Sequence, residues 1–313
     1  MKRRNALLLL PFLSSFLYSC NNDNLIVKRY FAFDTMVNVY LYESDSMHFS
    51  SIEKMIVETD KMLDTYSNQN GEAYRLNKEK EGEFDGDFIS LIKYCITLKD
   101  ISGGLFNILI SPLKELWDPI YSSSNKELPS IEEIDEAVDK ISSSSLEIDG
   151  NKAKIIGEAK TEFGAIGKGY CLGKIDSYLK DNGVKKYKVD AGSSSVILGE
   201  SGTEEGFNVN VKNYSNSFKA KNTSISTSSI FEQSQEIEGN IYSHILNPLT
   251  GSSSPLHECI VVEAEDPAFG DALSTILMNK TIDEIKEYEN EYSFSSMVFD
   301  EGKLTYSSIG NEG

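Results

Sequence analysis

The sequence lacks the residue patterns that mark several common classes of catalytic site. Its 313 residues include only three histidines and four cysteines. No Cys-x-x-Cys spacing indicates a zinc or redox pair, and the odd number of cysteines after Cys20 means that at least one cannot pair within the chain. Neither the Gly-x-Ser-x-Gly turn of many hydrolases nor the His-Glu-x-x-His helix of zinc peptidases is present. These absences argue against the usual serine hydrolases and zinc peptidases.

Basic residues are also scarce. The chain has 30 lysines and arginines against 49 aspartates and glutamates, which gives a net charge of −19 at pH 7. Nucleic-acid binding depends on a basic stripe, and none is visible in the sequence, so we expect no nucleic-acid partner. An anionic ligand would need local neutralisation by a metal ion, a lysine or backbone amides.

The first nineteen residues are organised as a targeting segment. A basic start at residues 2–4 is followed by an apolar run over residues 6–17, which is too short to span a bilayer comfortably. The ending Leu-Tyr-Ser-Cys resembles the lipobox of bacterial lipoproteins, which predicts lipidation of Cys20. The protein would then be anchored on the extracytoplasmic (periplasmic) side of the cell membrane. An uncleaved anchor or an ordinary signal peptide is the alternative.

The rest of the chain alternates irregularly between strand and helix patterns. Strands are expected over residues 31–41, 207–212, 223–227, 241–246 and 258–264, and hairpins at Asp149-Gly150 and Asp300-Glu301-Gly302. Helices are expected over residues 51–66, 87–100 and 266–278, with another starting at Ser130. This order favours a single α+β domain over residues 31–313, with a mixed or antiparallel sheet and flanking helices. Residues 20–30 would form a tether.

Two predicted helix starts share one sequence pattern. Ser50 with Glu53, and Ser130 with Glu133, have the spacing of a capping box, in which each side chain bonds the backbone of the other residue. We therefore expect the same cap at both helix starts.

One glycine-rich stretch suggests an anion site. The segment EFGAIGKGYCLGKIDSYLK over residues 162–180 combines three glycines with Lys168 and then an amphipathic helix. Glycines let a ligand approach the backbone, and the amides at a helix start favour an anion. A tight turn between a strand and a helix would explain the same glycines without any ligand.

Asp271 and Thr275 form the second candidate. They lie four residues apart in a predicted helix, so their oxygens share one face. A carboxylate and a hydroxyl are hard oxygen ligands suited to Mg²⁺. The alternative is an aspartate that complements the helix dipole beside a buried threonine.

His244 is the third candidate. It lies in a predicted strand that ends at Asn247-Pro248, a position that suits a general base or a phosphate contact. A histidine that only packs and hydrogen-bonds within a strand is the alternative.

Taken in order, eight segments resemble the motifs of the ApbE family of flavin transferases, also called FAD:protein FMN transferases. The segments are FDT at 33–35, GEAYRLN at 71–77, GLFNILISPLKELW at 104–117, EFGAIGKGY at 162–170, VDAGSSSVILG at 189–199, ISTSSIF at 225–231, HILNPLTG at 244–251 and GDALSTIL at 270–277. Together they cover nearly the whole chain after Cys20. The resemblance implies a bilobed ApbE-like domain that holds FAD in a cleft.

The resemblance also implies an activity. The family binds FAD with Mg²⁺, transfers FMN to a serine or threonine hydroxyl of a target protein, and releases AMP. The implied acceptor is a flavoprotein subunit of a membrane electron-transfer complex. Two alternatives are a FAD pyrophosphatase, in which water attacks instead, and a FAD-binding lipoprotein without catalysis.

Site residues follow from the resemblance by position. The implied metal ligands are Asp271, Thr275 and the carbonyl of Ala165, and the implied catalytic residues are His244 and Asp271. The implied FAD contacts are Phe33, Leu105, Phe106, Asn107, Glu162, Lys168 and Leu246. The chain departs from the family pattern at Asn107, Leu109, Glu162, Gly173, Ser193, Ser194 and Ser229. These departures fall mostly on flavin or nucleotide contacts, while the metal ligands are kept.

Overall fold

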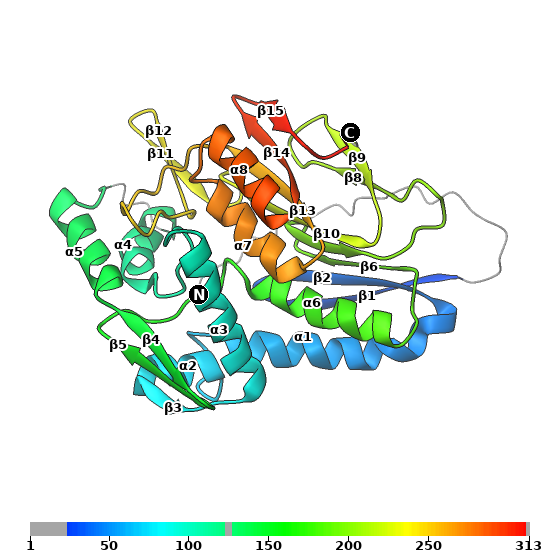
Figure 1. The fold of residues 1–313 in the computed structure, drawn as a ribbon, viewed down its shortest axis with the longest axis horizontal. Helices are drawn as coiled ribbons and strands as arrows, with labels where there is room; N and C mark the ends of the chain where they lie inside the picture. The colour runs from blue at the N-terminus through cyan, green and yellow to red at the C-terminus, as the bar shows by residue number, and fades with distance from the viewer. Residues whose placement is uncertain (1–23, 123–126, 311–313) are drawn as a thin grey trace, which may run out of the picture.

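An eight-stranded antiparallel sheet forms the centre of the molecule (Figure 1). The computed structural model describes residues 24–122 and 127–310, so the targeting segment and Cys20 lie outside the described residues. In spatial order the strands are β1 (Leu25–Ala32), β2 (Thr35–Tyr42), β6 (Tyr187–Ala191), β7 (Ser195–Leu198), β10 (Thr223–Ser229), β13 (Cys259–Ala264), β14 (Ser295–Asp300) and β15 (Lys303–Ser307). The predicted α+β class is confirmed.

Three small sheets surround the central one. They are β3 (Glu81–Glu83) with β5 (Lys152–Ile156) and β4 (Ser145–Asp149), β8 (Phe207–Asn210) with β9 (Ser217–Ala220), and β11 (Ser234–Ile237) with β12 (Asn240–Ser243). The helices are α1 (Phe49–Leu63), α2 (Glu72–Glu79), α3 (Gly86–Ile101), α4 (Ser111–Ser122), α5 (Ile131–Ser142), α6 (Gly167–Asp181), α7 (Pro267–Leu277) and α8 (Ile282–Tyr292), with a short 3-10 helix over Glu43–His48. The expected hairpins at residues 149–150 and 300–302 are confirmed as β4–β5 and β14–β15.

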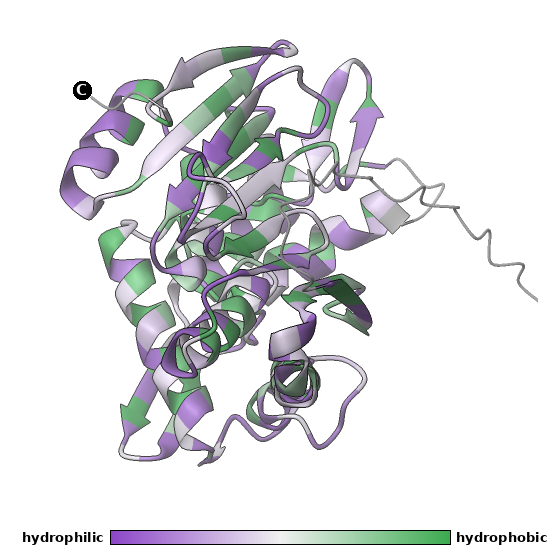
Figure 2. Cartoon of the chain, turned by 90° about the vertical axis from the view of Figure 1, so that its right-hand side faces the viewer, coloured by the Kyte–Doolittle hydropathy of each residue, from purple (hydrophilic) through white to green (hydrophobic). Residues whose placement is uncertain are grey.

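Alternation along the strands explains which helices cover the sheet. Val37, Val39 and Leu41 on β2 point to one face and are buried with α1 and α6. Further along the sheet, α7 packs on β10 and β13, where Val262 and Leu273 belong to the largest core cluster. Figure 2 shows the hydrophobic positions concentrated in the central strands and in the helices that pack on them. The core therefore holds the start of α6 and the start of α7 against the same sheet.

The N-terminal hairpin corrects two expectations. Residues 25–32 pair along their whole length with β2, so the expected tether over residues 20–30 is too long. The expected single strand over residues 31–41 is in fact two strands joined at Phe33 and Asp34, whose φ angles are 52° and 55°. Positive φ at both central residues is the backbone conformation of a tight hairpin turn. The turn places Phe33 at one end of the sheet.

The two expected capping boxes have different outcomes. The Ser130 and Glu133 box is confirmed at the start of α5. The prediction of a box at Ser50 and Glu53 is wrong, because α1 already begins at Phe49. Its N-cap residue is His48, which has helical backbone angles. A capping side chain needs an extended backbone at its own position. The 3-10 helix that leads into α1 removes that conformation.

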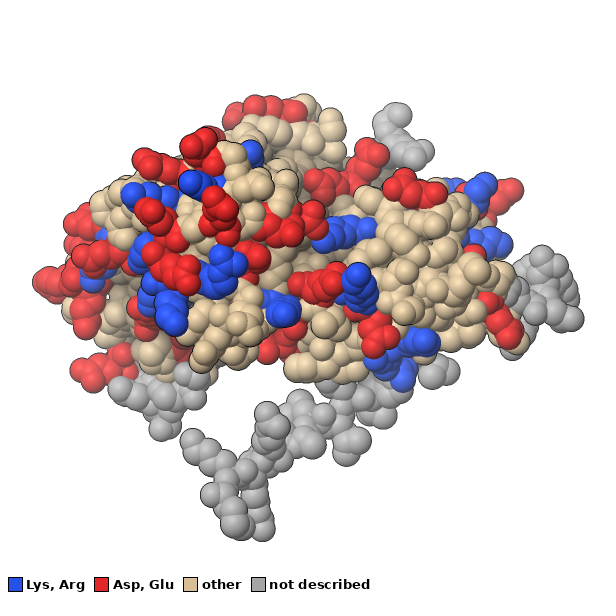
Figure 3. All heavy atoms as spheres, turned by 90° about the horizontal axis from the view of Figure 1, so that it is seen from below, with Lys and Arg blue, Asp and Glu red and all other residues tan. Residues whose placement is uncertain are grey.

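Surface charge agrees with the acidic composition. Seen from below, acidic and basic side chains are interspersed, and the basic ones form no continuous stripe on this face (Figure 3). Within the described parts of the chain, none of the helices has the length and apolar content needed to cross a membrane.

Candidate functional site

Asp271 joins the starts of two helices. It lies in α7, is 5% exposed, and its Oδ2 accepts a hydrogen bond from the backbone N–H of Gly169 at 2.8 Å. Its Oδ1 accepts a second hydrogen bond from Ser195 Oγ of β7 at 2.7 Å. Gly169 is the third residue of α6, so the carboxylate satisfies an otherwise unpaired amide at the positive end of that helix. The buried charge is thus held from two directions.

Gly169 is required for this contact. A Cβ atom at this position would lie 2.3 Å from the carbonyl oxygen of Pro267 and 2.6 Å from Cβ of Asp271. Both distances are well inside van der Waals contact. Only glycine lets α6 approach α7 closely enough for its amide to reach the carboxylate.

Hydroxyl groups continue the polar surface beside Asp271. Ser228 Oγ of β10 lies 2.8 Å from Ser274 Oγ and 3.3 Å from Thr275 Oγ1, both on α7. Ala165 lies in the turn that leads into α6. In an unbroken helix its carbonyl would accept from the N–H of Gly169, which here donates to Asp271. The segments carrying the three expected metal ligands therefore meet at the α6–α7 contact.

The donor atoms at this contact fit Mg²⁺. A carboxylate, a hydroxyl and a carbonyl are all oxygen donors, which is the set that Mg²⁺ prefers. Each oxygen of Asp271 accepts one hydrogen bond and keeps a second lone pair. Among residues 24–122 and 127–310, no three His, Cys, Asp or Glu side chains gather as a metal site. A cation held here would combine one carboxylate with neutral oxygens.

Glu162 lies at the centre of a second polar group. Its Oε2 accepts a hydrogen bond from the Tyr66 hydroxyl at 2.8 Å and lies 3.4 Å from Lys114 Nζ. Burial of the phenol and the nearby Glu162 carboxylate raise the pKa of Tyr66, so the hydroxyl stays protonated and donates. Tyr66 and Lys114 are not among the site residues expected from the sequence, because only the fold brings them to Glu162. Tyr66 as a whole residue is nevertheless 70% exposed, because it is the hydroxyl end that lies against Glu162.

His244 has one defined ring partner. Its Nδ1 lies 3.1 Å from the carbonyl oxygen of Gln233. Because a carbonyl can only accept, Nδ1 carries the proton and Nε2 carries the lone pair in the neutral ring. Burial lowers the pKa of His244, the hydrogen bond to Gln233 and the charge of Glu232 oppose this effect, and the nearby cations Lys168 and Lys114 add to it. The imidazole is therefore neutral at pH 7 and able to accept a proton at Nε2.

Three loops meet around these groups. The N–H of Glu162 donates to the carbonyl of Ile108 at 2.7 Å, which joins the 104–109 loop to the segment before α6. Trp117 Nε1 donates to the carbonyl of Gly251 at 3.0 Å, which holds the loop after His244 against α4. The structure therefore gathers the sequence motifs at residues 104–117, 162–170, 244–251 and 270–277.

The expected FAD contacts differ in how accessible they are. Leu105 and Lys168 are half-buried, whereas the side chains of Phe106 and Leu246 pack in the core. Asn107 is half-buried, and its Oδ1 accepts a hydrogen bond from the N–H of Leu109 at 3.0 Å. A ligand would thus meet the main chain of Phe106 and Leu246 before their side chains.

Phe33 lies in the β1–β2 turn. Its N–H donates to Asp60 Oδ1 of α1 at 2.7 Å. Its ring packs against the largest core cluster and also against the cluster beneath β1, β2 and β6. The hairpin turn is therefore fixed between the two clusters.

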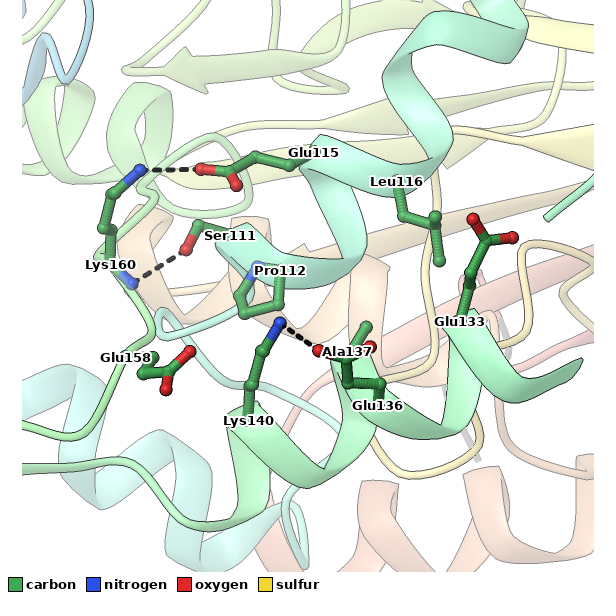
Figure 4. A pocket seen from close by; sticks show the side chains of 10 residues that line it. All are labelled: Ser111, Pro112, Glu115, Leu116, Glu133, Glu136, Ala137, Lys140, Glu158 and Lys160. Carbon is green, nitrogen blue, oxygen red and sulfur yellow. Dashed lines mark hydrogen bonds and ion pairs between the residues drawn. The ribbon is translucent and has the colours of Figure 1, made fainter. Parts of the chain in front are cut away.

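A hollow of about 340 Å³ lies between α4, α5 and residues 158–160 (Figure 4). Ion pairs line it, among them Lys160 Nζ with Glu115 Oε1 at 2.8 Å and Lys140 Nζ with Glu136 Oε1 at 2.7 Å. None of the candidate site residues lines it. Its four glutamates outnumber its two lysines, and this negative excess would repel the FAD diphosphate, so we do not assign the FAD site to this hollow.

Comparison with known proteins finds the same family that the motifs resemble. A model of the ApbE family matches residues 33–297. The FAD:protein FMN transferase of Vibrio cholerae is 24% identical over 213 residues, which cover 64% of this chain and 64% of that protein. The FAD:protein FMN transferase of Buchnera aphidicola is 23% identical over 226 residues, which cover 67% of this chain and 66% of that protein. The chain thus matches slightly less than two thirds of the length of each relative.

Solved structures share the fold. The crystal structure of the ApbE protein from Thermotoga maritima superposes with a TM-score of 0.80 at 22% identity, and the match covers 91% of this chain and 97% of that one. At this identity the likeness establishes the architecture. The arrangement of α6, α7 and the central sheet is therefore that of known ApbE structures.

Proposed function

This chain belongs to the ApbE family, and we propose that it is a FAD:protein FMN transferase that transfers FMN from FAD to a serine or threonine hydroxyl and releases AMP. The observation that carries the proposal is the α6–α7 contact. There the buried Asp271 carboxylate, the Thr275 hydroxyl and the start of a glycine-rich helix carrying Lys168 meet at one place. Such a site combines hard oxygen ligands with positive potential for a diphosphate.

The acidic chain can hold the FAD diphosphate because neutralisation is local. Lys168 and the positive end of α6 favour the anion. Asp271, Thr275 and the Ala165 carbonyl would hold Mg²⁺. When bound, Mg²⁺ supplies charge neutralisation to the diphosphate and to the departing AMP.

His244 would act as the general base. Its Nε2 takes the proton of the acceptor hydroxyl while the hydroxyl oxygen forms a bond to the FMN phosphorus. The bond between that phosphorus and the bridging oxygen breaks, and AMP leaves with the electron pair. The neutral ring is prepared for this role because Gln233 fixes the proton on Nδ1.

The remaining contacts would position FAD. Phe33, Leu105, Phe106, Asn107, Glu162, Lys168 and Leu246 are the proposed contact residues. Glu162 is held by Tyr66 and Lys114, so its orientation is set before a ligand arrives. Tyr66, which is exposed, offers a stacking surface for a planar ring of FAD.

We also propose that Cys20 is lipidated and that the enzyme acts on the extracytoplasmic side of the cell membrane. The motif order supports the family, and the lipobox-like sequence supports the anchor. The acceptor would be a flavoprotein subunit of a membrane electron-transfer complex. Palmitate labelling that is absent in Cys20→Ala tests the anchor, and labelling that persists in this variant contradicts it.

AMP release from FAD tests the enzymatic proposal. We expect the full chain to release AMP only when Mg²⁺ is present, and we expect Asp271→Ala to lose this activity. Ser254→Ala is a matched control, because Ser254 is exposed and lies on the surface loop before Leu256. AMP without a labelled acceptor would make the protein a FAD pyrophosphatase. FAD binding without AMP under every condition would make it a FAD-binding lipoprotein.

A further inference from the structure

In the part of the chain that the structure describes, one face of the sheet beside β1 remains exposed. On β1, β2 and β6, the residues that alternate with the core-facing ones point away from α1 and α6. We call this surface the open face, and it comprises Arg29, Phe31, Met36, Tyr40, Lys186 and Lys188 with their strand neighbours. Toward β7 the same side of the sheet is covered by β8 and β9, where Leu198 and Phe218 belong to one cluster.

The open face is apolar and aromatic for a solvent-exposed surface. Phe31 is 72% exposed, and Met36, directly opposite it in the register, is 39% exposed. Val27 is also exposed and lies opposite Tyr40. Exposed apolar side chains gathered on one strand pair indicate a binding surface more than scattered ones do.

The open face is also basic in an acidic protein. Lys188 Nζ lies 5.5 Å from the centroid of the Tyr40 ring, and Lys186 Nζ lies 5.9 Å from that of Tyr42. Arg29 lies on the same side of β1. Asp190, opposite Asn38, is the acidic side chain in register with them. The chain as a whole carries a charge of −19, so this local excess of cations is unusual.

Basic and aromatic side chains around apolar ones form the usual pattern of a membrane-interface surface. Tyrosine sits at the level of the lipid headgroups, and lysine and arginine attract anionic lipids while their stems cover apolar area. A second copy of the chain fits less well, because a two-fold contact would place the cations of one face opposite those of the other.

The position of Cys20 brings this face to the membrane. Leu25 is five positions after Cys20, and five residues can span at most about 18 Å even when fully extended. Leu25 already belongs to β1, at the edge of the sheet. A lipid on Cys20 therefore keeps the first residue of β1 within that distance of the bilayer.

We propose that the open face of β1, β2 and β6 lies against the lipid headgroups and orients the enzyme on the membrane. This inference rests on the lipid anchor proposed above. Phe33 is in the turn at one end of the same hairpin. The orientation therefore holds the edge of the FAD site close to the bilayer, where acceptor segments of membrane proteins emerge.

Lipid quenching of a fluorophore tests the orientation. The full chain is inserted through its anchor into vesicles of phosphatidylethanolamine and phosphatidylglycerol that contain a headgroup nitroxide lipid. Arg29→Cys or Lys188→Cys is labelled, and the native Cys95, Cys171 and Cys259 are buried and do not compete. We expect strong quenching at both positions.

Two controls make the comparison specific. Lys28→Cys is on the same strand as Arg29 but on its opposite face, and Lys303→Cys is on β15 at the far edge of the sheet. We expect weaker quenching at Lys28→Cys and none at Lys303→Cys. Equal quenching at all positions overturns the proposal. Fluorescence of the label at position 29 that changes only with protein concentration also overturns it, and favours a second copy of the chain on this face.

Failure of this inference can be told from failure of the activity or of the anchor. Arg29 and Lys188 lie outside the proposed site, so both variants are expected to keep AMP release from FAD. If quenching is uniform while AMP release persists, the proposed orientation is refuted and the proposed activity is not. Labelling of the chain without an added cysteine would show that Cys20 is free, and vesicle binding is then measured in Cys20→Ser. Failure of that variant to bind vesicles containing phosphatidylglycerol also overturns the proposal.

Discussion

At the scale of single residues, the contact between α6 and α7 depends on the absence of a side chain at position 169. The backbone of Gly169 approaches Pro267 and Asp271 more closely than any side chain allows. The sequence shows the glycine and the aspartate but not their contact, because they are 102 residues apart. The same limit explains why Ser195 and Tyr66 were missed, since each reaches the site only through a fold contact with a distant residue.

Gly169→Ala tests the importance of this approach. We expect it to lower the free energy of unfolding by about 1–3 kcal/mol or more through overpacking, and to reduce AMP release. Gly173→Ala is the matched control, because it lies one turn later in α6 and its Cβ would be 3.8 Å from Pro267. That change is expected to stabilise the chain by about 0.5–1 kcal/mol. Equal urea midpoints for the two variants would refute the account.

The lowered pKa of His244 predicts how the rate of transfer depends on pH. Burial lowers its pKa below the ordinary value of 6.5, so the neutral, proton-accepting ring is kept until the pH falls below that value. We expect kcat/KM for transfer to be constant near pH 7 and to fall as acid protonates His244. His244→Gln should lower the rate by about 10²–10⁴-fold and remove the acidic limb. An unchanged acidic limb in His244→Gln would assign the titration to another group.

At the scale of elements, the sequence predicts the structure well where neighbouring residues alone determine it. The hairpins at Asp149-Gly150 and over residues 300–302 formed as expected because glycine supplies the positive φ that those turns need. Edge strand β1 was missed because its alternation is mixed with Lys28 and Arg29, which a tether would also contain. Helix α8 is not among the expected helices, although Thr281 and Glu284 form a capping box at its start.

The two Ser-x-x-Glu patterns allow a direct comparison. Ser130 caps α5, and its Oγ accepts from the N–H of Glu133 at 3.2 Å, whereas Ser50 lies inside α1. Ser130→Ala is expected to cost about 1 kcal/mol in the free energy of unfolding. Ser50→Ala is expected to cost nothing, because alanine is the better helix former at an exposed helical position. Similar losses in thermal unfolding of both variants would mean that Ser50 also acts as a cap.

At the scale of the whole molecule, the fold class could be predicted from the order of elements. The motifs predicted which segments carry the candidate site, and the roles of the individual residues stay predictions. What the sequence could not show is how the loops at residues 104–109, 162–169 and 244–251 converge, since tertiary packing decides it. The same holds for the open face, because exposure of Phe31 depends on which elements leave that side of the sheet uncovered.

The transferase proposal concerns the fate of the FMN group, so the decisive measurement follows both products. The full chain is given FAD, Mg²⁺ and an acceptor flavoprotein subunit, and covalent flavin on the acceptor is compared with AMP released. The account predicts equal amounts of the two products, with both lost together in Asp271→Ala. AMP in excess with free FMN and an unlabelled acceptor would contradict it and would show that water is the acceptor.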